Sequence, residues 1–379
     1  MPVNLKGIKM TRSDDSSRSV GVALLFFIFI WKCLGTASAT AQEVVANDVK
    51  LYPEKLDKNF HFIPVPYGNY EEVTGISVGL APLVMFHPVA EDTLSPASVL
   101  GLFGMYAQNK SRMGMGFTQL FFNEDRWRLT AAFGQAQINY QFVMRHPDWE
   151  IIPYESGLNF GFLQVERRLF SRLYGGLTYY QTQYNTRIKS QEADAFSLTQ
   201  VGIGMNLSLD KRPDFYYPRN GSLAQLNFYI HPEWMGNAKP VRILEMEFQQ
   251  YFSLRNEQDV LVLRFYAGLK GGYISFNDQF ILGDGNIRGY STGAHRAHHL
   301  LTFQAEYRYN FHAKWGAVGF VEGATLFQAV DSRDNGQIFP SVGAGIRYEV
   351  WQKPRFTIGM DVAMGRQDGG LYLRIGTAF

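Results

Sequence analysis

Cysteine, net charge and long apolar runs are all scarce in this chain, and each shortage excludes a class of protein. Cys33 is the one cysteine among 379 residues, so we expect no disulfide framework and no cysteine-based metal site. Lys and Arg total 36 against 34 Asp and Glu, which leaves no basic excess for a nucleic acid as partner. The slightly negative mean hydropathy is too low for a bundle of membrane-spanning helices of this size.

The one long apolar run, 20–31, lies where a secretory signal peptide has its hydrophobic segment. A basic stretch precedes it, and Ala39-Thr40-Ala41 follows as a small-x-small cleavage site. The run is too short to span a bilayer as a helix. We therefore predict a signal peptide over 1–41, which contains Cys33 and leaves the exported chain without a thiol. The residues before Cys33 are not the small ones of a lipoprotein signal, so no lipid anchor is expected.

What the chain has in quantity is alternation. Between 300 and 311, one face of an extended segment carries only apolar side chains and the other only polar ones: Leu301, Phe303, Ala305, Tyr307, Tyr309 and Phe311 against Thr302, Gln304, Glu306, Arg308 and Asn310. A strand repeats every two residues, so this segment has one apolar wall and one polar wall. Many long segments of this kind in series, rich in aromatic residues, indicate a barrel whose apolar side faces lipid and whose polar side faces a lumen.

Strand-like segments follow one another from residue 60 onward, and no stretch favours a stable helix. We predict an all-β fold, a transmembrane antiparallel β-barrel over 60–379, preceded by a short periplasmic segment over 42–59. The expected strands lie near 72–87, 97–108, 112–122, 126–143, 157–168, 172–185, 196–210, 221–231, 240–254, 259–273, 299–311, 315–327, 339–351, 355–364 and 370–379.

The number of strands has two solutions, because this list is odd and bacterial single-chain barrels usually have an even number. A short first strand over 60–65 gives sixteen, which is the preferred prediction. Loss of one weakly patterned segment, either 126–143 or 157–168, gives fourteen.

The charged residues of these strands share the face opposite the apolar one, as Arg264, Lys270, Arg347 and Asp361 do. A charge on the lipid face near the midplane would cost about 2–4 kcal/mol, so these charges must point inward. The lumen therefore holds acids and bases together, and such a lining fits either a water-filled pore or a plugged, ion-paired interior.

One segment, 274–298, is rich in glycine and too long for a tight hairpin. Its Ile287-Arg288-Gly289-Tyr290 resembles the Val/Ile-Arg-Gly-Phe/Tyr tip of the loop that folds into the barrel in the bacterial surface antigen family, which includes the BamA- and TamA-type assembly factors and the two-partner secretion pores. Further resemblances occur in the family's order: Tyr217-Pro218-Arg219-Asn220-Gly221, Phe320-Val321-Glu322-Gly323-Ala324, Gly343-x-Gly345-x-Arg347-Tyr348 and Gly376-x-x-Phe379.

The resemblance implies a loop held in the lumen by its arginine, which pairs with acidic residues on the inner wall. Carried over to this sequence, the partners of Arg288 would be Glu322, Asp361 or both, with Glu322 standing where the family usually has Asp. A guanidinium in a confined lumen needs bidentate carboxylate partners to offset its desolvation. In the alternative interpretation Arg288 is a solvated residue of an external loop.

Two enzyme-like patterns have structural explanations. Gly75-Ile76-Ser77-Val78-Gly79 fits a nucleophile motif, but that motif works only at a strand-to-helix turn, and here it begins a strand. His295, His298 and His299 stand at the end of the loop without a carboxylate pattern nearby, which favours a loop tail over a metal site. We therefore predict no enzymatic activity, no cofactor and no metal.

The resemblance implies an integral protein of the bacterial outer membrane that assists the insertion or translocation of other proteins there. Segment 42–59 is too short for the polypeptide-transport-associated (POTRA) repeats of the family, so a separate periplasmic partner is expected. The alternatives are a channel or passive pore gated by the 274–298 loop, and a structural surface antigen. Outer-membrane lipid, lipopolysaccharide and the barrel assembly machinery are the other expected partners.

The last strand carries an export pattern. Leu371, Leu373, Ile375 and Phe379 share a face and resemble the C-terminal signal by which outer-membrane barrels are delivered to the machinery that inserts them.

Overall fold

In a computed structural model of the chain, the residues that the structure describes are 60–71, 74–89, 91–92, 94–145, 149–188, 196–255, 258–283, 286–352 and 355–375. The predicted signal peptide (1–41), the predicted periplasmic segment (42–59) and Phe379 lie outside these residues. In the part described, no helix is long and apolar enough to cross a membrane.

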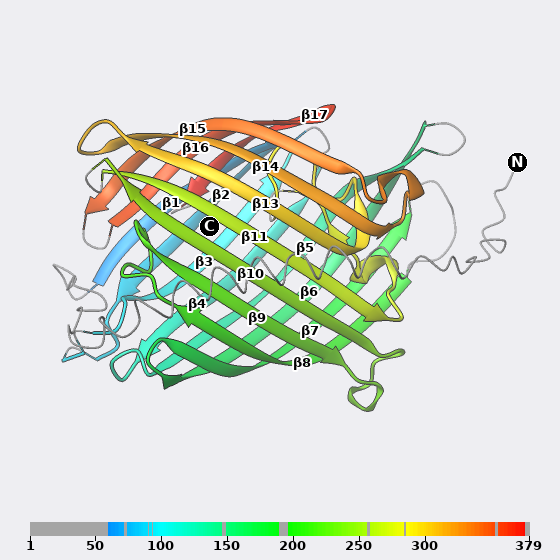
Figure 1. Cartoon of the computed structure of the whole chain (residues 1–379). Helices are drawn as coiled ribbons and strands as arrows, with labels where there is room; N and C mark the ends of the chain where they lie inside the picture. Colours follow the sequence, from blue (N-terminus) through cyan, green and yellow to red (C-terminus); the bar gives the residue numbers. More distant parts are fainter. Residues whose placement is uncertain are drawn as a thin grey trace, which may run out of the picture. The chain divides into compact units, whose positions relative to one another are not determined.

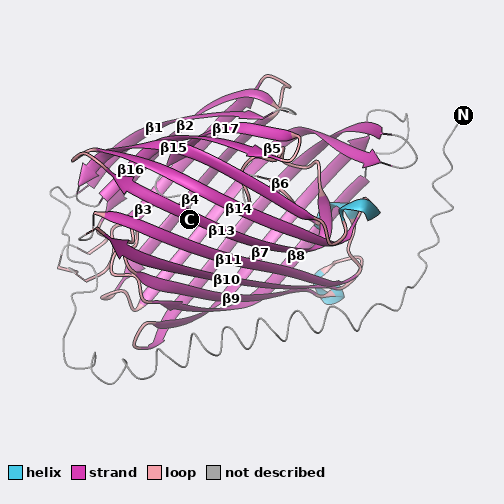
Figure 2. Ribbon diagram, turned by 45° about the horizontal axis from the view of Figure 1, so that its top comes forward, coloured by secondary structure: helices cyan, strands magenta, loops and turns pink. Residues whose placement is uncertain are grey.

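The described residues form one antiparallel sheet that closes on itself as a barrel (Figures 1 and 2). Each strand of the wall pairs with its neighbours in sequence, and β1 pairs with β17 to close the ring. The strands are β1 (Phe60–Glu71), β2 (Gly75–Phe86), β3 (Ser98–Ala107), β4 (Arg112–Phe122), β5 (Trp127–Arg145), β6 (Trp149–Phe170), β7 (Leu173–Ile188), β8 (Phe196–Asp210), β9 (Gly221–His231), β10 (Val241–Leu254), β11 (Asp259–Gly272), β12 (Phe280–Ile281), β13 (Arg296–Asn310), β14 (Trp315–Ala329), β15 (Ile338–Gln352), β16 (Arg355–Gly365) and β17 (Asp368–Ile375).

The wall contains sixteen strands, because β12 is a two-residue strand of a loop whose pairing, among the described residues, is with β13. The preferred prediction of a sixteen-stranded barrel is confirmed, and the fourteen-stranded alternative is wrong. Both weakly patterned segments are strands, and β5 and β6 are the longest of all, with 19 and 22 residues.

Several boundaries differ from the sequence prediction; β6, for example, begins at Trp149 rather than near residue 157. The first strand has 12 residues rather than the few expected. The sequence prediction ended it too early, because Pro64 and Pro66 lie inside it. The second strand begins at Gly75 rather than near residue 72, where Gly75 adopts a φ of +67° as part of the turn. β13 begins at Arg296. His298 and His299 therefore lie on a strand, whereas we had expected them in the tail of the loop.

The two faces of the strands follow the predicted alternation. On β13, Phe303 is 51% exposed on the outer face, whereas Glu306 and Arg308 on the inner face are 1% and 2% exposed. On β14, Val321 points outward and Glu322 inward. The outer wall is therefore apolar, and the charges are inside, as the cost of exposing them to lipid requires.

The barrel has two distinguishable ends. One, here called the terminal end, holds the start of β1, the end of β17 and the connection between β8 and β9. The other, here called the loop end, holds the β16–β17 turn and the longest connection, 273–295, which joins β11 to β13 through β12.

Register places glycines where inner side chains need room. Gly345 of β15 lies directly opposite Asp361 of β16, and a Cβ atom at Gly345 would overlap the Asp361 carboxylate and lie 2.5 Å from the Met360 carbonyl oxygen. A Cβ atom at Gly319 of β14, in contrast, would have no heavy atom within 4 Å.

We expect Gly345→Ala to destabilise the barrel by about 1–3 kcal/mol, the usual range for overpacking. The control Gly319→Ala should leave stability unchanged or slightly raised, because alanine restricts the unfolded chain. The heat-induced gel shift of the folded barrel measures both variants. Equal unfolding temperatures for the two would contradict the role of Gly345.

Candidate functional site in the barrel lumen

The connection 273–295 turns back into the barrel. Ser275 and Asp278 cap the short 3₁₀ helix η4 (Phe276–Asp278), and β12 then pairs with the start of β13. The Leu282 N–H donates to the His295 carbonyl, which closes the base of the loop, and the Ile287 N–H donates to the Gly283 carbonyl. These backbone hydrogen bonds fix the orientation of the loop, so that the side chain of the next residue, Arg288, points toward the inner wall.

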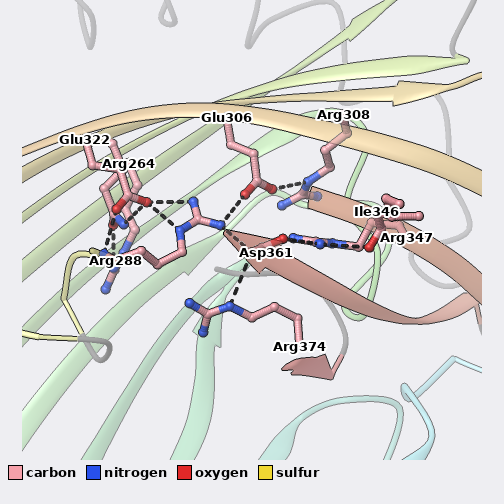
Figure 3. Close-up of polar contacts among 10 residues, drawn as sticks. Arg264, Arg288, Glu306, Arg308, Glu322, Ile346, Arg347, Asp361 and Arg374 are labelled. Atoms are coloured by element: carbon pink, nitrogen blue, oxygen red, sulfur yellow. Dashed lines mark hydrogen bonds and ion pairs between the residues drawn. The ribbon is translucent and has the colours of Figure 1, made fainter. Parts of the chain in front are cut away.

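Arg288 lies at the centre of a buried ion network (Figure 3), with 2% of its surface exposed. Its Nε and Nη2 donate to Glu322 Oε1 at 2.8 and 2.6 Å, and its backbone N–H donates to the other oxygen of Glu322 at 2.7 Å. Its Nη1 donates to Asp361 at 2.8 Å and to Glu306 at 3.1 Å. The structure thus brings Arg288 together with both residues proposed as its partners, and with Glu306, which was not proposed.

Strand parity places these three carboxylates on the lumen side. Glu306 comes from β13, Glu322 from β14 and Asp361 from β16, and each is at most 6% exposed. Below the guanidinium lies the ring of Phe320, whose centroid is 3.4 Å from the Arg288 Cζ atom. The planar group is therefore bound at its edge by carboxylates and on its face by an aromatic ring.

The carboxylates in turn bind further arginines. Glu306 accepts from Arg308 at 2.9 Å, and Asp361 accepts from Arg347 and, at 3.4 Å, from Arg374. Four guanidinium groups therefore surround three carboxylates, so the network is close to neutral. Burial lowers the pKa of Arg288, and the three carboxylates raise it by more, so this arginine stays charged.

The residues after Arg288 bind the last strands of the barrel. Gly289 has a φ of +82°, which favours glycine, and a Cβ atom there would lie 2.8 Å from the Gly365 nitrogen. Its N–H donates to the Tyr372 hydroxyl on β17 at 2.9 Å. Tyr290 donates to the Pro340 carbonyl on β15 at 2.7 Å. The four-residue motif therefore connects the inner wall from β13 to β17.

Apolar contacts hold the same loop from its other side. Leu282, Ile287 and Tyr290 are at most 1% exposed and form one cluster with inward-pointing residues of the wall: Ala297, Leu300, Ala324, Leu326 and Phe339. The loop thus has an ionic anchor at Arg288 and an apolar anchor nearer the loop end. The sequence motif predicted the first of these but not the second, because the cluster joins residues from separate strands.

A second segment crosses the lumen at the terminal end, and the sequence analysis considered only its last residues, as a family-like motif. It is the β8–β9 connection, 211–220. Its Tyr216 hydroxyl donates to the Ala97 carbonyl before β3, and its Tyr217 ring stacks under Arg355 of β16 at 4.1 Å. Phe215 meets Phe121 of β4 edge to face at 5.1 Å. Three consecutive aromatic residues in a connection were the signal that could have revealed it.

The structure shows where the residues of the two enzyme-like patterns lie. Ser77 is a buried, inward-pointing residue of strand β2. His295 Nδ1 lies 2.7 Å from Asp334, and His298 contacts Gln328 instead. Within the described residues, no three His, Cys, Asp or Glu side chains gather as metal ligands would.

Comparison with known proteins agrees with this geometry. The model of the Omp85 superfamily domain matches residues 97–379, three quarters of the chain. The chain belongs to the Omp85 superfamily. No curated protein sequence matches it.

Three solved structures resemble the chain in fold. BamA from Haemophilus ducreyi lacking POTRA domains 1–3 aligns with a TM-score of 0.55 and 13% identity, over 85% of this chain and 71% of that one. CdiB from Acinetobacter baumannii aligns with 0.55 and 11%, over 84% and 60%. CdiB from Escherichia coli aligns with 0.55 and 11%, over 86% and 68%. This chain therefore spans about two thirds of the length of these proteins.

Membership of this family makes the chain an integral protein of the bacterial outer membrane, as the resemblance of its loop motif implied. Outer-membrane barrels have short periplasmic turns and longer extracellular loops. The terminal end accordingly faces the periplasm, and the loop end faces outward.

We expect Arg288→Ala to lower the unfolding temperature of the barrel, because it leaves buried carboxylates without their shared partner. Breaking such a pair costs roughly 3–5 kcal/mol. The control is Arg126→Ala, which removes an arginine that is 59% exposed and 3.8 Å from Glu124, a pair expected to contribute about 0–1 kcal/mol. Heat-induced gel shifts would compare them, and an Arg288 variant as stable as the control would contradict the network.

Proposed function

We propose that this barrel assists the insertion or translocation of other proteins at the outer membrane. The observation that carries the proposal is an asymmetric barrel, in which an internal loop braces strands β13 to β17 while the junction of β17 with β1 is weakly paired. Such a junction offers a free backbone edge, to which an incoming strand can add by β-augmentation.

The pairing at this junction, here called the seam, is short. β1 and β17 pair at only three described positions, Asn69 with Tyr372, Tyr70 with Leu371 and Glu71 with Gly370. β1 pairs with β2 at twelve positions along its whole length. The described seam therefore has about a quarter of the pairing that holds β1 on its other side.

Two prolines explain why β1 pairs poorly on the seam side. Pro64 lies opposite Pro82 of β2. Opposite residues either exchange two N–H···O bonds or make none, and prolines have no N–H to exchange. The backbone of Pro64 must therefore face the seam, as must that of Pro66 two residues later. The β2–β3 register likewise lacks pairs at Ala81 and Pro82, which fits Pro82 facing β3.

The motif loop reaches the same seam from inside. Tyr372, which accepts the Gly289 N–H, is the partner of Asn69 at the last described pair of the seam. The position of the loop and the position of the β17 edge are thus mechanically connected. In this proposal Phe379 and the outward residues of β17 also serve as the signal that delivers the chain itself to the assembly machinery, and a separate periplasmic partner gathers the client proteins.

Locking the seam should abolish the proposed activity. Tyr70→Cys with Leu371→Cys places two cysteines at directly opposite positions, where Cα atoms are about 4.5–5.5 Å apart and a disulfide can form. In cells depleted of the native protein, the oxidised variant should fail to restore normal amounts of other outer-membrane barrels, and reduction should restore them.

The matched control is Val78→Cys with Tyr106→Cys, which joins β2 to β3 through outward residues away from the seam. This disulfide should be harmless. If depletion of the native protein leaves every other barrel at its normal abundance, the assembly role is wrong.

Conductance distinguishes the assembly role from the channel alternative. Because two segments cross the lumen, the assembly role predicts a barrel that is closed to ions. The intact barrel should conduct little in planar bilayers, and Arg288→Ala should raise its conductance by freeing the loop. Stable, large conductance from the intact protein, together with a harmless seam lock, would favour a pore over an assembly factor.

A further inference from the structure

A small cavity lies at the loop end of the barrel, between the β14–β15 and β16–β17 connections. Its volume is about 240 Å³. Arg333 and Gln337 line it from the β14–β15 connection, and Arg366 and Gln367 line it from the β16–β17 turn. All four residues are exposed, so the cavity opens at the surface.

The two arginines of this cavity differ from those of the lumen. Within the described residues, neither the Arg333 nor the Arg366 guanidinium has a carboxylate or hydrogen-bond partner. The nearby acids bind other groups: Asp334 contacts His295, and Asp368 accepts the Ser291 N–H at 2.6 Å. The cavity therefore presents two positive charges without a bound counter-charge.

The backbone that carries these arginines is held in place. Arg333 belongs to the 3₁₀ helix η5 (Ser332–Asp334), and its N–H donates to the Asp331 side chain at 2.9 Å. The Arg366 N–H donates to the Tyr290 hydroxyl at 3.0 Å. Because both backbones are fixed, less conformational entropy is lost when a ligand binds.

The outer wall next to the cavity is apolar. Ile338, which also lines the cavity, is 71% exposed on the outward face of β15. Val342 follows it on the same face at 57%, and Met364 of β16 is 66% exposed beside it. The cavity thus lies where the lipid-facing wall ends and the outward-facing connections begin.

We propose that this cavity binds a phosphate group, carried by the headgroup of a phosphorylated glycolipid in the outer leaflet. Arginine is suited to the task because its planar fork donates two parallel hydrogen bonds to phosphate oxygens. The amides of Gln337 and Gln367 supply further donors. The acyl chains of such a lipid would lie against Ile338 and Val342, and a free phosphate would use the same donors without the apolar contacts.

The site is connected to the lumen through Tyr290. This residue ends the motif that begins at Ile287, and its hydroxyl bridges the Arg366 N–H and the Pro340 carbonyl. A lipid bound at Arg366 therefore supports the β16–β17 turn that the loop also contacts. The proposal does not depend on the assembly role, since it concerns only the outward-facing surface.

Binding can be measured on the purified full-length barrel in detergent. The unfolding temperature is followed while bis-phosphorylated lipid A, dephosphorylated lipid A or inorganic phosphate is added, with chloride at matched ionic strength. A ligand that binds only the folded state raises this temperature. The test variant is Arg333→Ala with Arg366→Ala, and the control is Arg126→Ala with Lys314→Ala, which removes two exposed positive charges at the terminal end.

We expect bis-phosphorylated lipid A to stabilise the native protein and the control, and the test variant to need at least about tenfold more lipid for the same shift, a difference of about 1.4 kcal/mol. Equal protection by inorganic phosphate, lost in the test variant, would support the site and assign it to a soluble phosphate. Equal protection of the native protein and the test variant by every probe, or no protection at all, would overturn the proposal.

Discussion

The burial of Arg288 is the interaction on which the interior of this barrel depends. A guanidinium removed from water is unfavourable unless carboxylates surround it, and three strands supply those carboxylates from the inner wall. The same carboxylates bind the arginines of the wall, so Glu306 or Asp361 could not be changed without leaving other charges uncompensated. The loop is therefore part of the charge balance of the wall, and the barrel and its loop form one electrostatic unit.

Much of this arrangement could be predicted from the sequence, for a definite physical reason. The period of two in a strand assigns each side chain to lipid or lumen, so the inward direction of Arg264 and Asp361 followed from charge alone. The resemblance of the loop motif supplied Arg288 and two of its partners. Glu306 was already placed on the polar face, but its pairing depends on where the loop places Arg288 along β13, which periodicity does not determine.

Other features stayed hidden because they depend on contacts between distant segments. Pro64 and Pro66 made the first strand look short, since proline is usually a sign that a strand ends. The aromatic residues of 211–220 meet Ala97, Phe121 and Arg355, which lie far away in the sequence. No local pattern specifies such partners, whereas the alternation of a strand is specified within a few residues.

The distribution of these contacts decides which side of the seam can move. Withdrawing the loop from the lumen would separate Arg288 from its carboxylates and expose the apolar cluster around Ile287. Both the ion pairs and the apolar contacts therefore oppose withdrawal of the loop. Tyr372 ties the loop to β17. Separation at the seam would therefore leave β17 with the braced half of the barrel and release β1, whose prolines already deprive it of donors on that edge. The internal loop that stabilises the barrel thus also determines where it is weakest.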